Sequence, residues 1–372
     1  MLHAMGGLSG SLPDWIVRLG TFLLGLYYAA CCLLPVRKSV AMFTSYPDVA
    51  DNSQAMFEYL RTLDRGLHCE WLVGSDFDPA SHDLAGARLY KRASLSAIRA
   101  TATAQYVFHT HGIYRFARKR RGQTIVNLWH GMPLKAIGAF DPNVPRLPIG
   151  DVAIATSDFF ADKLAQAFMM PKRSILVTGQ PRNDLLIRLA KKSEPNIILW
   201  MPTYRSSSTG DIREDSSFNS ELMARILHNI DVKLEGQSIR FVLKLHPMDT
   251  MNELLADNFN NIEILRKGDP QPSVPELLAS SMALISDYSS VVVDYAILDR
   301  PIGFFCPDKD DYVRGWIPGV ADLFFKSGTM LPNLDALVSF IISPTEFTSR
   351  CLALVEHCDD KAAERIWLSV NS

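Results

Sequence analysis

The 372-residue sequence lacks several motifs that would identify an enzyme class directly. It has no glycine-rich Walker loop, no GxGxxG after the first expected strand and no GxSxG elbow, which argues against P-loop NTPases, dinucleotide-binding enzymes and α/β-hydrolases. No Asp-x-Asp element stands out as a clamp for a metal-bound diphosphate. We therefore expect neither a metal nor a cofactor, and phosphate chemistry on this chain would depend on basic side chains and helix ends.

Cysteine pairs and an excess of charge of one sign are also missing. The six cysteines form no CxxC pair and match no zinc spacing, which is typical of indifferent thiols in a reducing cytosol. The net charge of -2 gives no reason to expect nucleic acid as a partner. A local basic run is either a solvated turn or a segment that faces phospholipid or a phosphorylated acceptor; it consists of Arg115, Arg118, Lys119, Arg120 and Arg121.

A long transmembrane run is lacking too. Trp15–Leu34 carries one charge, Arg18, and its uncharged part, Leu19–Leu34, is sixteen residues long. A spanning helix needs roughly 20 apolar residues, so this run is on the short side. Tyr27 and Tyr28 are residues that favour the headgroup level, and no convincing signal-peptide cleavage site follows. We expect a helix that lies on or dips into the cytoplasmic face of the membrane, with a packed internal helix and a single span as alternatives.

Beyond this segment, short apolar strands alternate with helical patterns, which predicts a mostly parallel sheet covered on both faces. The first set of expected strands is Val40–Thr44, Trp71–Val73, Tyr106–Phe108, Ile125–Asn127, Val152–Ala155 and Ile175–Val177. The second set is Ile197–Trp200, Phe241–Leu245, Ile262–Leu265, Ala283–Ser286 and Ile302–Phe305. Helices are expected near Gln54–Leu63, Asp158–Phe168 (with Asp158 as N-cap) and Val291–Leu298.

Two such sets predict an α/β protein with two Rossmann-like domains facing a central cleft. We expect residues 1–38 to associate with the membrane, 39–188 to form the first domain and 189–345 the second. A C-terminal helix within 346–372, near Glu346–Val370, would brace the two domains. The polar stretch Ser206–Ser217 is predicted to be a mobile loop.

Ligands of open α/β sheets bind at the carboxyl ends of strands, and the distinctive polar motifs here each follow an expected strand. The longest is Asn-Leu-Trp-His-Gly-Met-Pro-Leu-Lys-Ala-Ile-Gly at Asn127–Gly138. His130 in it would titrate near neutrality and reach a hydroxyl proton, as a general base must, while Lys135 would meet an anionic substrate. The alternative is that His130 is a structural residue of a strand-to-helix loop.

Two motifs after later strands offer cations and hydroxyls to a phosphate. In Lys-Leu-His-Pro, Lys244 and His246 share one face, and His246 would stabilise charge on a departing phosphate unless it is structural. Met-Pro-Thr-Tyr-Arg supplies the Thr203 hydroxyl and the Arg205 guanidinium.

Ser-Asp-Tyr-Ser-Ser at Ser286–Ser290 opens an expected helix. Its free amides, with Ser289 and Ser290, would bind an anion, or these residues simply cap the helix. In Gly-Gln-Pro-Arg-Asn-Asp, Arg182 contacts substrate, or it pairs with Asp184 or with a carboxylate at the domain interface.

His109 and His111 of Phe-His-Thr-His-Gly share one face of a strand, as a metal pair would. No third ligand is recognisable, so a polar contact to an acceptor or a structural role is expected.

Five motifs, in their order along the chain, resemble those of the CDP-glycerol glycerophosphotransferase family, which includes teichoic acid primases and polymerases and related capsule enzymes. They are Trp-His-Gly-Met-Pro-Leu-Lys-Ala-Ile-Gly, Gly-Gln-Pro-Arg-Asn-Asp, Met-Pro-Thr-Tyr-Arg, Lys-Leu-His-Pro and Ser-Asp-Tyr-Ser-Ser. The resemblance runs from about Leu33 to Phe305. It implies a GT-B fold, with the nucleotide donor in the C-terminal domain and the acceptor facing the N-terminal one. It also implies transfer of glycerol phosphate from CDP-glycerol to a hydroxyl, with release of CMP.

Carried over to this sequence, the resemblance makes His130 the general base and places the donor's phosphates against His246, Arg205, Thr203, Ser289 and Ser290, with Asp287 in the same pocket and Lys244 nearby. Lys135, Arg182 and His111 are left as acceptor or cleft candidates. The implied partners are a CDP-polyol and an undecaprenyl-linked saccharide at the cytoplasmic membrane face. Three features depart from the family pattern: Met132, Met201 and the sequence Phe-His-Thr-His-Gly. These departures leave the identity of the acceptor and of the donor's polyol open.

Two other functions remain as alternatives. A GT-B glycosyltransferase would move a sugar from a sugar nucleotide on the same architecture and release a nucleoside diphosphate. A non-catalytic membrane-associated scaffold would keep its function after loss of His130.

Overall fold

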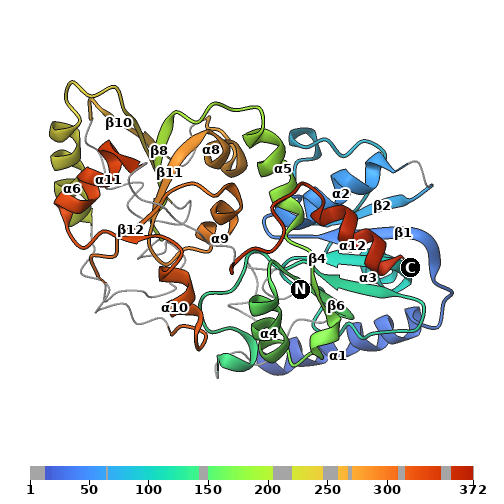
Figure 1. Ribbon diagram of the computed structural model, residues 1–372. Coiled ribbons are helices and arrows are strands. Elements are labelled where there is room, and N and C mark those ends of the chain that lie inside the picture. Colours follow the sequence, from blue (N-terminus) through green and yellow to red (C-terminus); the bar gives the residue numbers. More distant parts are fainter. Residues whose placement is uncertain are drawn as a thin grey trace. The chain divides into compact units, whose positions relative to one another are not determined.

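The computed structural model describes residues 13–63, 66–141, 150–203, 220–245, 259–266, 270–308, 315–344 and 353–371. The chain forms two compact units. The first unit comprises Met1–His130, Asp141–Asp184 and Lys361–Ser372, and the second comprises Gly131–Phe140 and Leu185–Asp360. Each unit is built on its own parallel sheet (Figure 1).

The sheet of the first unit has, in the part of the chain that the structure describes, seven parallel strands in the order β3-β2-β1-β4-β5-β6-β7. They are β1 (Arg37–Thr44), β2 (His68–Val73), β3 (Arg88–Lys91), β4 (Ala104–His109), β5 (Thr124–Asn127), β6 (Val152–Ala155) and β7 (Ile175–Val177). The helices of this unit are α1 (Asp14–Cys31), α2 (Asp51–Thr62), α3 (Leu95–Thr103), α4 (Asp158–Ala167), the start of α5 (Pro181–Ala190) and α12 (Ala362–Val370). Short 3-10 turns are η1 (Pro79–Ser81) and η3 (Lys172–Ser174).

Both faces of this sheet are buried, as the continuous apolar strands predict. On one face Phe43 stacks on Trp71 and Phe108 beneath α2 and α12. On the other face Met42 and Val107 pack with residues of α1 and α3.

The second unit contains, within the described ranges, a six-stranded parallel sheet in the order β10-β9-β8-β11-β12-β13. Its strands are β8 (Ile197–Trp200), β9 (Arg240–Lys244), β10 (Ile262–Leu265), β11 (Ser281–Ser286), β12 (Ile302–Phe304) and β13 (Thr329–Met330). Its helices are α6 (Ser220–Lys233), α8 (Val274–Ser280), α9 (Val291–Tyr295), α10 (Val320–Phe325) and α11 (Leu334–Ile342), with 3-10 turns η2 (Gly138–Phe140) and η4 (Ala296–Leu298). Trp200, Phe241 and Leu243 lie in the core beneath α6 and α11.

The prediction of an α/β protein with two parallel sheets is confirmed, and two local predictions are wrong. The N-cap of α4 is Ser157, whose hydroxyl accepts from the backbone N–H of Phe160, and Asp158 is the first helical residue. Glu346–Val370 is not one helix: residues 353–361 are not helical, and α12 begins at Ala362. The predicted loop Ser206–Ser217 lies outside the described residues.

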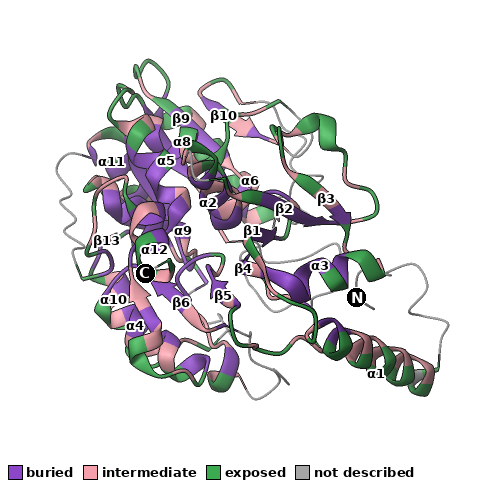
Figure 2. Cartoon of the chain, turned by 90° about the vertical axis from the view of Figure 1, so that its right-hand side faces the viewer, coloured by how far each residue is buried: buried purple, intermediate pink, exposed green. Residues whose placement is uncertain are grey.

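The expected N-terminal helix is α1. Tyr28 and Cys31 bury one face of it in the core, while the opposite face leaves five large apolar side chains exposed: Trp15, Leu19, Phe22, Leu23 and Leu26 (Figure 2). Among the helices that the structure describes, none has both the length and the apolar character needed to cross a bilayer.

Candidate functional site

The Trp-His-Gly loop leaves the carboxyl end of β5 in the first unit. The side-chain oxygen of Asn127 accepts from the backbone N–H of Trp129 at 3.0 Å, which turns the chain directly after the strand. Trp129 has φ +49° and Gly131 has φ +136°, a region that favours glycine. A non-glycine residue keeps such a backbone only where its surroundings hold it.

Asn52 of α2 stabilises this loop conformation through hydrogen bonds. Its side-chain N–H group donates to the carbonyls of Leu128 at 3.1 Å and Trp129 at 3.0 Å, and the residue is fully buried. Its side-chain oxygen accepts from the backbone N–H of Arg182 at 3.1 Å. One amide therefore joins the start of α2, the loop after β5 and the start of α5.

Arg182 completes the support of the loop. Its Nη1 donates to the Asp51 carboxylate at 2.7 Å and to the backbone carbonyl of His130 at 3.1 Å. The sequence left open whether Arg182 meets substrate or a carboxylate, and the structure pairs it with Asp51. Asp184 instead accepts from the backbone N–H groups of Ala362 and Ala363.

The His130 ring is fixed by a backbone carbonyl. Its Nδ1 lies 3.3 Å from the carbonyl oxygen of Thr110, and since a carbonyl only accepts, Nδ1 carries the proton in this contact. The neutral ring then has its lone pair on Nε2, which is the state a general base requires. Trp129 lies against the ring with centroids 4.3 Å apart.

The surroundings lower the pKa of His130. Burial is the largest cause and Arg182 acts in the same direction, while the Thr110 carbonyl and Asp51 oppose the shift. His130 and His111 nevertheless remain exposed along part of their surface, so solvent moderates these effects. The net direction favours the neutral, proton-accepting imidazole at neutral pH.

His111 lies beside His130, and His109 is the last residue of β4, two positions earlier. His109 is fully buried and its Nδ1 accepts from the backbone N–H of Gly112 at 3.0 Å. The two histidines of Phe-His-Thr-His-Gly thus have different surroundings. No group of three metal-ligating side chains occurs in the parts of the chain that the structure describes.

In the second unit, Asp287 ties together the carboxyl ends of β8 and β11. This buried carboxylate accepts from the backbone N–H of Thr203 at 2.9 Å, from the Thr203 hydroxyl at 2.6 Å and from the backbone N–H of Tyr288 at 2.6 Å. Thr203 and Asp287 are therefore brought together as expected, and the Thr203 hydroxyl donates to Asp287.

Ser289 and Ser290 open α9, which is five residues long before it tightens into η4. The Ser289 hydroxyl accepts from the backbone N–H of Val291 at 3.4 Å, and Ser290 makes no side-chain cap. The short helix limits the contribution of a helix dipole here.

The remaining candidates are less defined. Lys244 ends β9, and its ammonium group donates to the side chain of Gln271, while burial lowers its pKa. Lys135 forms an isolated antiparallel bridge with Trp316 in the second unit. His246 and Arg205 lie outside the described residues.

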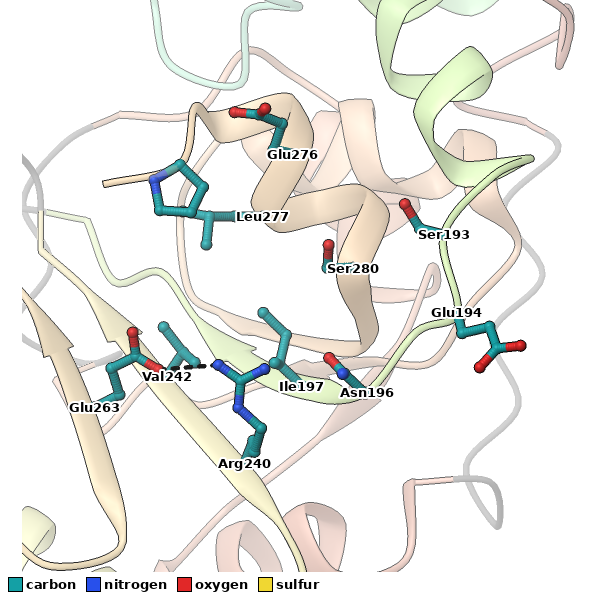
Figure 3. A pocket seen from close by; sticks show the side chains of 11 residues that line it. Ser193, Glu194, Asn196, Ile197, Arg240, Val242, Glu263, Glu276, Leu277 and Ser280 are labelled. Carbon is teal, nitrogen blue, oxygen red and sulfur yellow. Dashed lines mark hydrogen bonds and ion pairs between the residues drawn. The ribbon is translucent and has the colours of Figure 1, made fainter. Parts of the chain in front are cut away.

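A hollow in the second unit lies at the amino ends of its strands, whereas Thr203 and Asp287 follow the carboxyl ends (Figure 3). Ile197 and Arg240, which begin β8 and β9, line it, and Arg240 donates to Glu263 at 3.3 Å. Because ligands of parallel sheets bind at the carboxyl ends, this hollow is not a candidate for the chemistry of the motifs.

Sequence reasoning missed Asp51, Asn52 and Thr110. Asp51 and Asn52 open α2 after the loop that leaves the carboxyl end of β1, and that position was an available signal. Thr110 acts through its backbone carbonyl, for which a sequence carries no signal.

Comparisons with known proteins identify the family of the chain. A family model described as CDP-Glycerol:Poly(glycerophosphate) glycerophosphotransferase matches residues 26–367. The teichoic acid ribitol-phosphate primase of Bacillus spizizenii is 25% identical, with 91% of this chain and 92% of that protein covered. The teichoic acid poly(glycerol phosphate) polymerase of Staphylococcus epidermidis is 26% identical over 75% of this chain and 42% of that protein.

Solved structures are similar in fold. The wall teichoic acid polymerase TagF matches with a TM-score of 0.70 at 21% identity, covering 96% of this chain and 95% of that chain. The UDP-GlcNAc 2-epimerase of Methanocaldococcus jannaschii matches with a TM-score of 0.57 at 12% identity, covering 89% and 99%. The chain spans only 42% and 40% of the length of two glycerol phosphate polymerases that it matches.

Proposed function

Because the chain belongs to the CDP-glycerol:poly(glycerophosphate) glycerophosphotransferase family, we propose that it transfers a polyol phosphate from a CDP-linked donor to a hydroxyl group and releases CMP. The observation that carries this proposal is the His130 imidazole. Its Nδ1 proton is engaged by the Thr110 carbonyl, and Nε2 makes no hydrogen bond with the described residues.

In the proposed reaction, Nε2 of His130 takes the proton of the acceptor hydroxyl as its oxygen attacks the β-phosphorus of the donor. A new oxygen–phosphorus bond forms, the pyrophosphate bond breaks, and CMP leaves with the bonding electrons. A base that is neutral at the working pH suits this step. The lowered pKa of His130 supports that state.

The donor's phosphates are assigned to the second unit. We place them near Lys244, Thr203, Ser289 and Ser290, with Asp287 as the residue that orders the Thr203 loop. His246 and Arg205 are proposed to meet the charge of the departing CMP, on the strength of their motifs. In this scheme residues 39–188 face the acceptor and 189–345 bind the donor, as in a GT-B enzyme.

The acceptor is proposed to be a lipid-linked saccharide of teichoic acid or capsule synthesis. The names of the relatives include both glycerol phosphate and ribitol phosphate enzymes, which supports a CDP-polyol donor without choosing between the two polyols. One of the TagF structures was obtained with CDPG, which supports the same donor class.

A lipid-linked acceptor requires the enzyme to work at a membrane. We propose that α1 and the basic run within Arg115–Arg121 bind the cytoplasmic leaflet together. The Tyr28 hydroxyl of α1 donates to the Arg118 carbonyl at 3.4 Å, and Arg120 donates to the Leu34 carbonyl at 2.8 Å. The basic run is therefore in contact with α1 and with Leu34 just beyond it, and its Arg118 and Arg121 are exposed, as is the apolar face of the helix. Apolar burial and attraction to anionic lipid would act at one surface.

The test is nucleotide release by the purified protein with CDP-glycerol, CDP-ribitol or UDP-sugars, each with and without a short lipid-linked saccharide. Acceptor-dependent CMP from a CDP-polyol supports the proposal and identifies the polyol. Release of UDP from a UDP-sugar, with no CMP from either CDP-polyol, would replace it with the glycosyltransferase alternative.

A further inference from the structure

His111 lies almost parallel to His130 in the first unit. The two ring centroids are 4.1 Å apart and the ring planes differ by 12°. This is closer and flatter than the contact between Trp129 and His130, whose planes differ by 33°. The His130 ring is therefore nearly parallel to the His111 ring and stacks on it.

Thr110 connects the two imidazoles. Its backbone carbonyl lies 3.3 Å from Nδ1 of His130, and its hydroxyl lies 2.9 Å from Nδ1 of His111. Its backbone N–H donates to the carbonyl of Thr44 at the end of β1, and the residue is fully buried. One anchored residue thus fixes one nitrogen of each ring.

His111 is itself held from a further direction. The Tyr46 ring meets it edge to face, with centroids 5.9 Å apart. The row Tyr46, His111, His130 and Trp129 joins the loops after β1, β4 and β5 at the carboxyl edge of the sheet.

We propose that His111 is a positioning residue for His130: its stacked ring sets the plane of the His130 imidazole and keeps Nδ1 on the Thr110 carbonyl. This inference rests on the proposed function for its kinetic consequence, since it concerns the direction in which Nε2 of the base points. His111 does not take the substrate proton in this scheme.

The charges around the pair agree with this division of roles. Burial lowers the pKa of His111 to about 4, and the neighbouring His130 adds to that shift. Asp51 raises the pKa of His111, and His109 lowers it further. Arg182 lowers the pKa of His130. His111 is therefore neutral when His130 gains a proton, and a neutral ring can remain stacked on an imidazolium.

The kinetic test compares His111→Ala and His111→Phe with the control His68→Ala. His68 is an exposed histidine at the amino end of β2, whereas His111 follows the carboxyl end of β4. A flat ring without nitrogens should keep the stack, whereas alanine should not. We expect His111→Ala to lower kcat about 10-fold with both KM values within about 2-fold, because misorientation of a reacting group costs rate. His111→Phe should retain most of kcat.

Two kinetic results would overturn the proposal. A higher acceptor KM with unchanged kcat in His111→Ala would make His111 an acceptor contact. A loss in His111→Phe as large as in His111→Ala would mean that the imidazole nitrogens, and not the stack, matter.

A measurement without substrate separates this inference from the proposed function. Nitrogen-15 NMR of histidine-labelled protein, with the His130 signals identified by their loss in His130→Gln, reports which ring nitrogen carries the proton. We expect the Nδ1–H form of His130 to dominate in the parent protein and in His111→Phe, and to lose population in His111→Ala. An unchanged tautomer in His111→Ala would overturn the positioning role, even in a protein that fails to release CMP.

Discussion

Arg182 and His130 are joined through the main chain: Nη1 of Arg182 donates to the backbone carbonyl of His130 at 3.1 Å and to the Asp51 carboxylate at 2.7 Å. The histidine is thereby held at its backbone by a residue 52 positions away, while Thr110 and His111 hold its ring. The proposed base is therefore supported by the loop after β4 and by the first turns of α2 and α5.

Replacing Arg182 should therefore lower activity without removing the base. We expect Arg182→Ala to reduce kcat by about 100-fold, because a small displacement of a catalytic group has effects of that order. Arg182→Lys should lose less, since it keeps the charge but not the forked donors. Arg188→Ala, an exposed position on the same helix, serves as the control in the same CMP-release assay. Equal activity of Arg182→Ala and the control would contradict the supporting role.

The pH profile should reflect the lowered pKa of His130. A general base works when it is neutral, so kcat/KM should be constant near pH 7 and fall on acidification only below the ordinary histidine value of about 6.5. The measurement is kcat/KM from pH 5 to 8 at constant ionic strength. An acid limb centred above pH 7 would show that the pKa of His130 is not lowered, or that another group is the base.

Asp184 should stabilise the first unit by capping α12. Its buried carboxylate accepts from the backbone N–H groups of Ala362 and Ala363, each at 2.9 Å. Asp184→Ala leaves these donors unsatisfied, so we expect a loss of about 1–3 kcal/mol in the free energy of unfolding. Asp335→Ala, at an exposed position in the first turn of α11, should change it by less than about 0.5 kcal/mol. Urea denaturation measures both, and similar midpoints for the two variants would contradict the capping role.

The apolar face of α1 should govern binding to lipid. Burying a phenylalanine contributes about 1.5–3 kcal/mol, so Phe22→Glu should lower partitioning into anionic vesicles at least about 10-fold. Val232→Glu, at an exposed apolar position on α6, is the matched control. Arg118→Glu should weaken binding to anionic vesicles and leave binding to neutral ones unchanged. Vesicle co-sedimentation provides the measurement, and unchanged binding of Phe22→Glu would exclude α1 from the membrane surface.

Much of the fold could be predicted because the central strands are buried on both faces. Val152–Ala155 and Ile197–Trp200 are continuous apolar runs within their sheets, and their predicted bounds agree with the structure. The strand Arg88–Lys91 was missed because it lies at a sheet edge, where Arg88 and Lys91 are exposed and interrupt the apolar run. The start of α12 was wrong because its cap, Asp184, comes from a residue 178 positions earlier.

The site divides in a similar way. His130 was found because its motif follows a strand, and convergence at the carboxyl edge predicted that it would have neighbours. The sequence did not predict which residues those neighbours would be. Asn52 is 77 positions from Trp129, whose carbonyl it binds. Thr110 contributes a backbone carbonyl, which every residue possesses. Pairing across loops is set by the register of β1, β4 and β5, which the sequence leaves open.

The most direct test of the account is acceptor-dependent CMP release by His130→Gln beside the parent protein and His68→Gln. Glutamine keeps polar volume but does not take up a proton at neutral pH, so removal of a base should lower the rate by about 100-fold to 10,000-fold. We predict that loss for His130→Gln, full activity for His68→Gln, and retained binding of the CDP-polyol by both. CMP release by His130→Gln at the parent rate would contradict the assignment of His130 as the base.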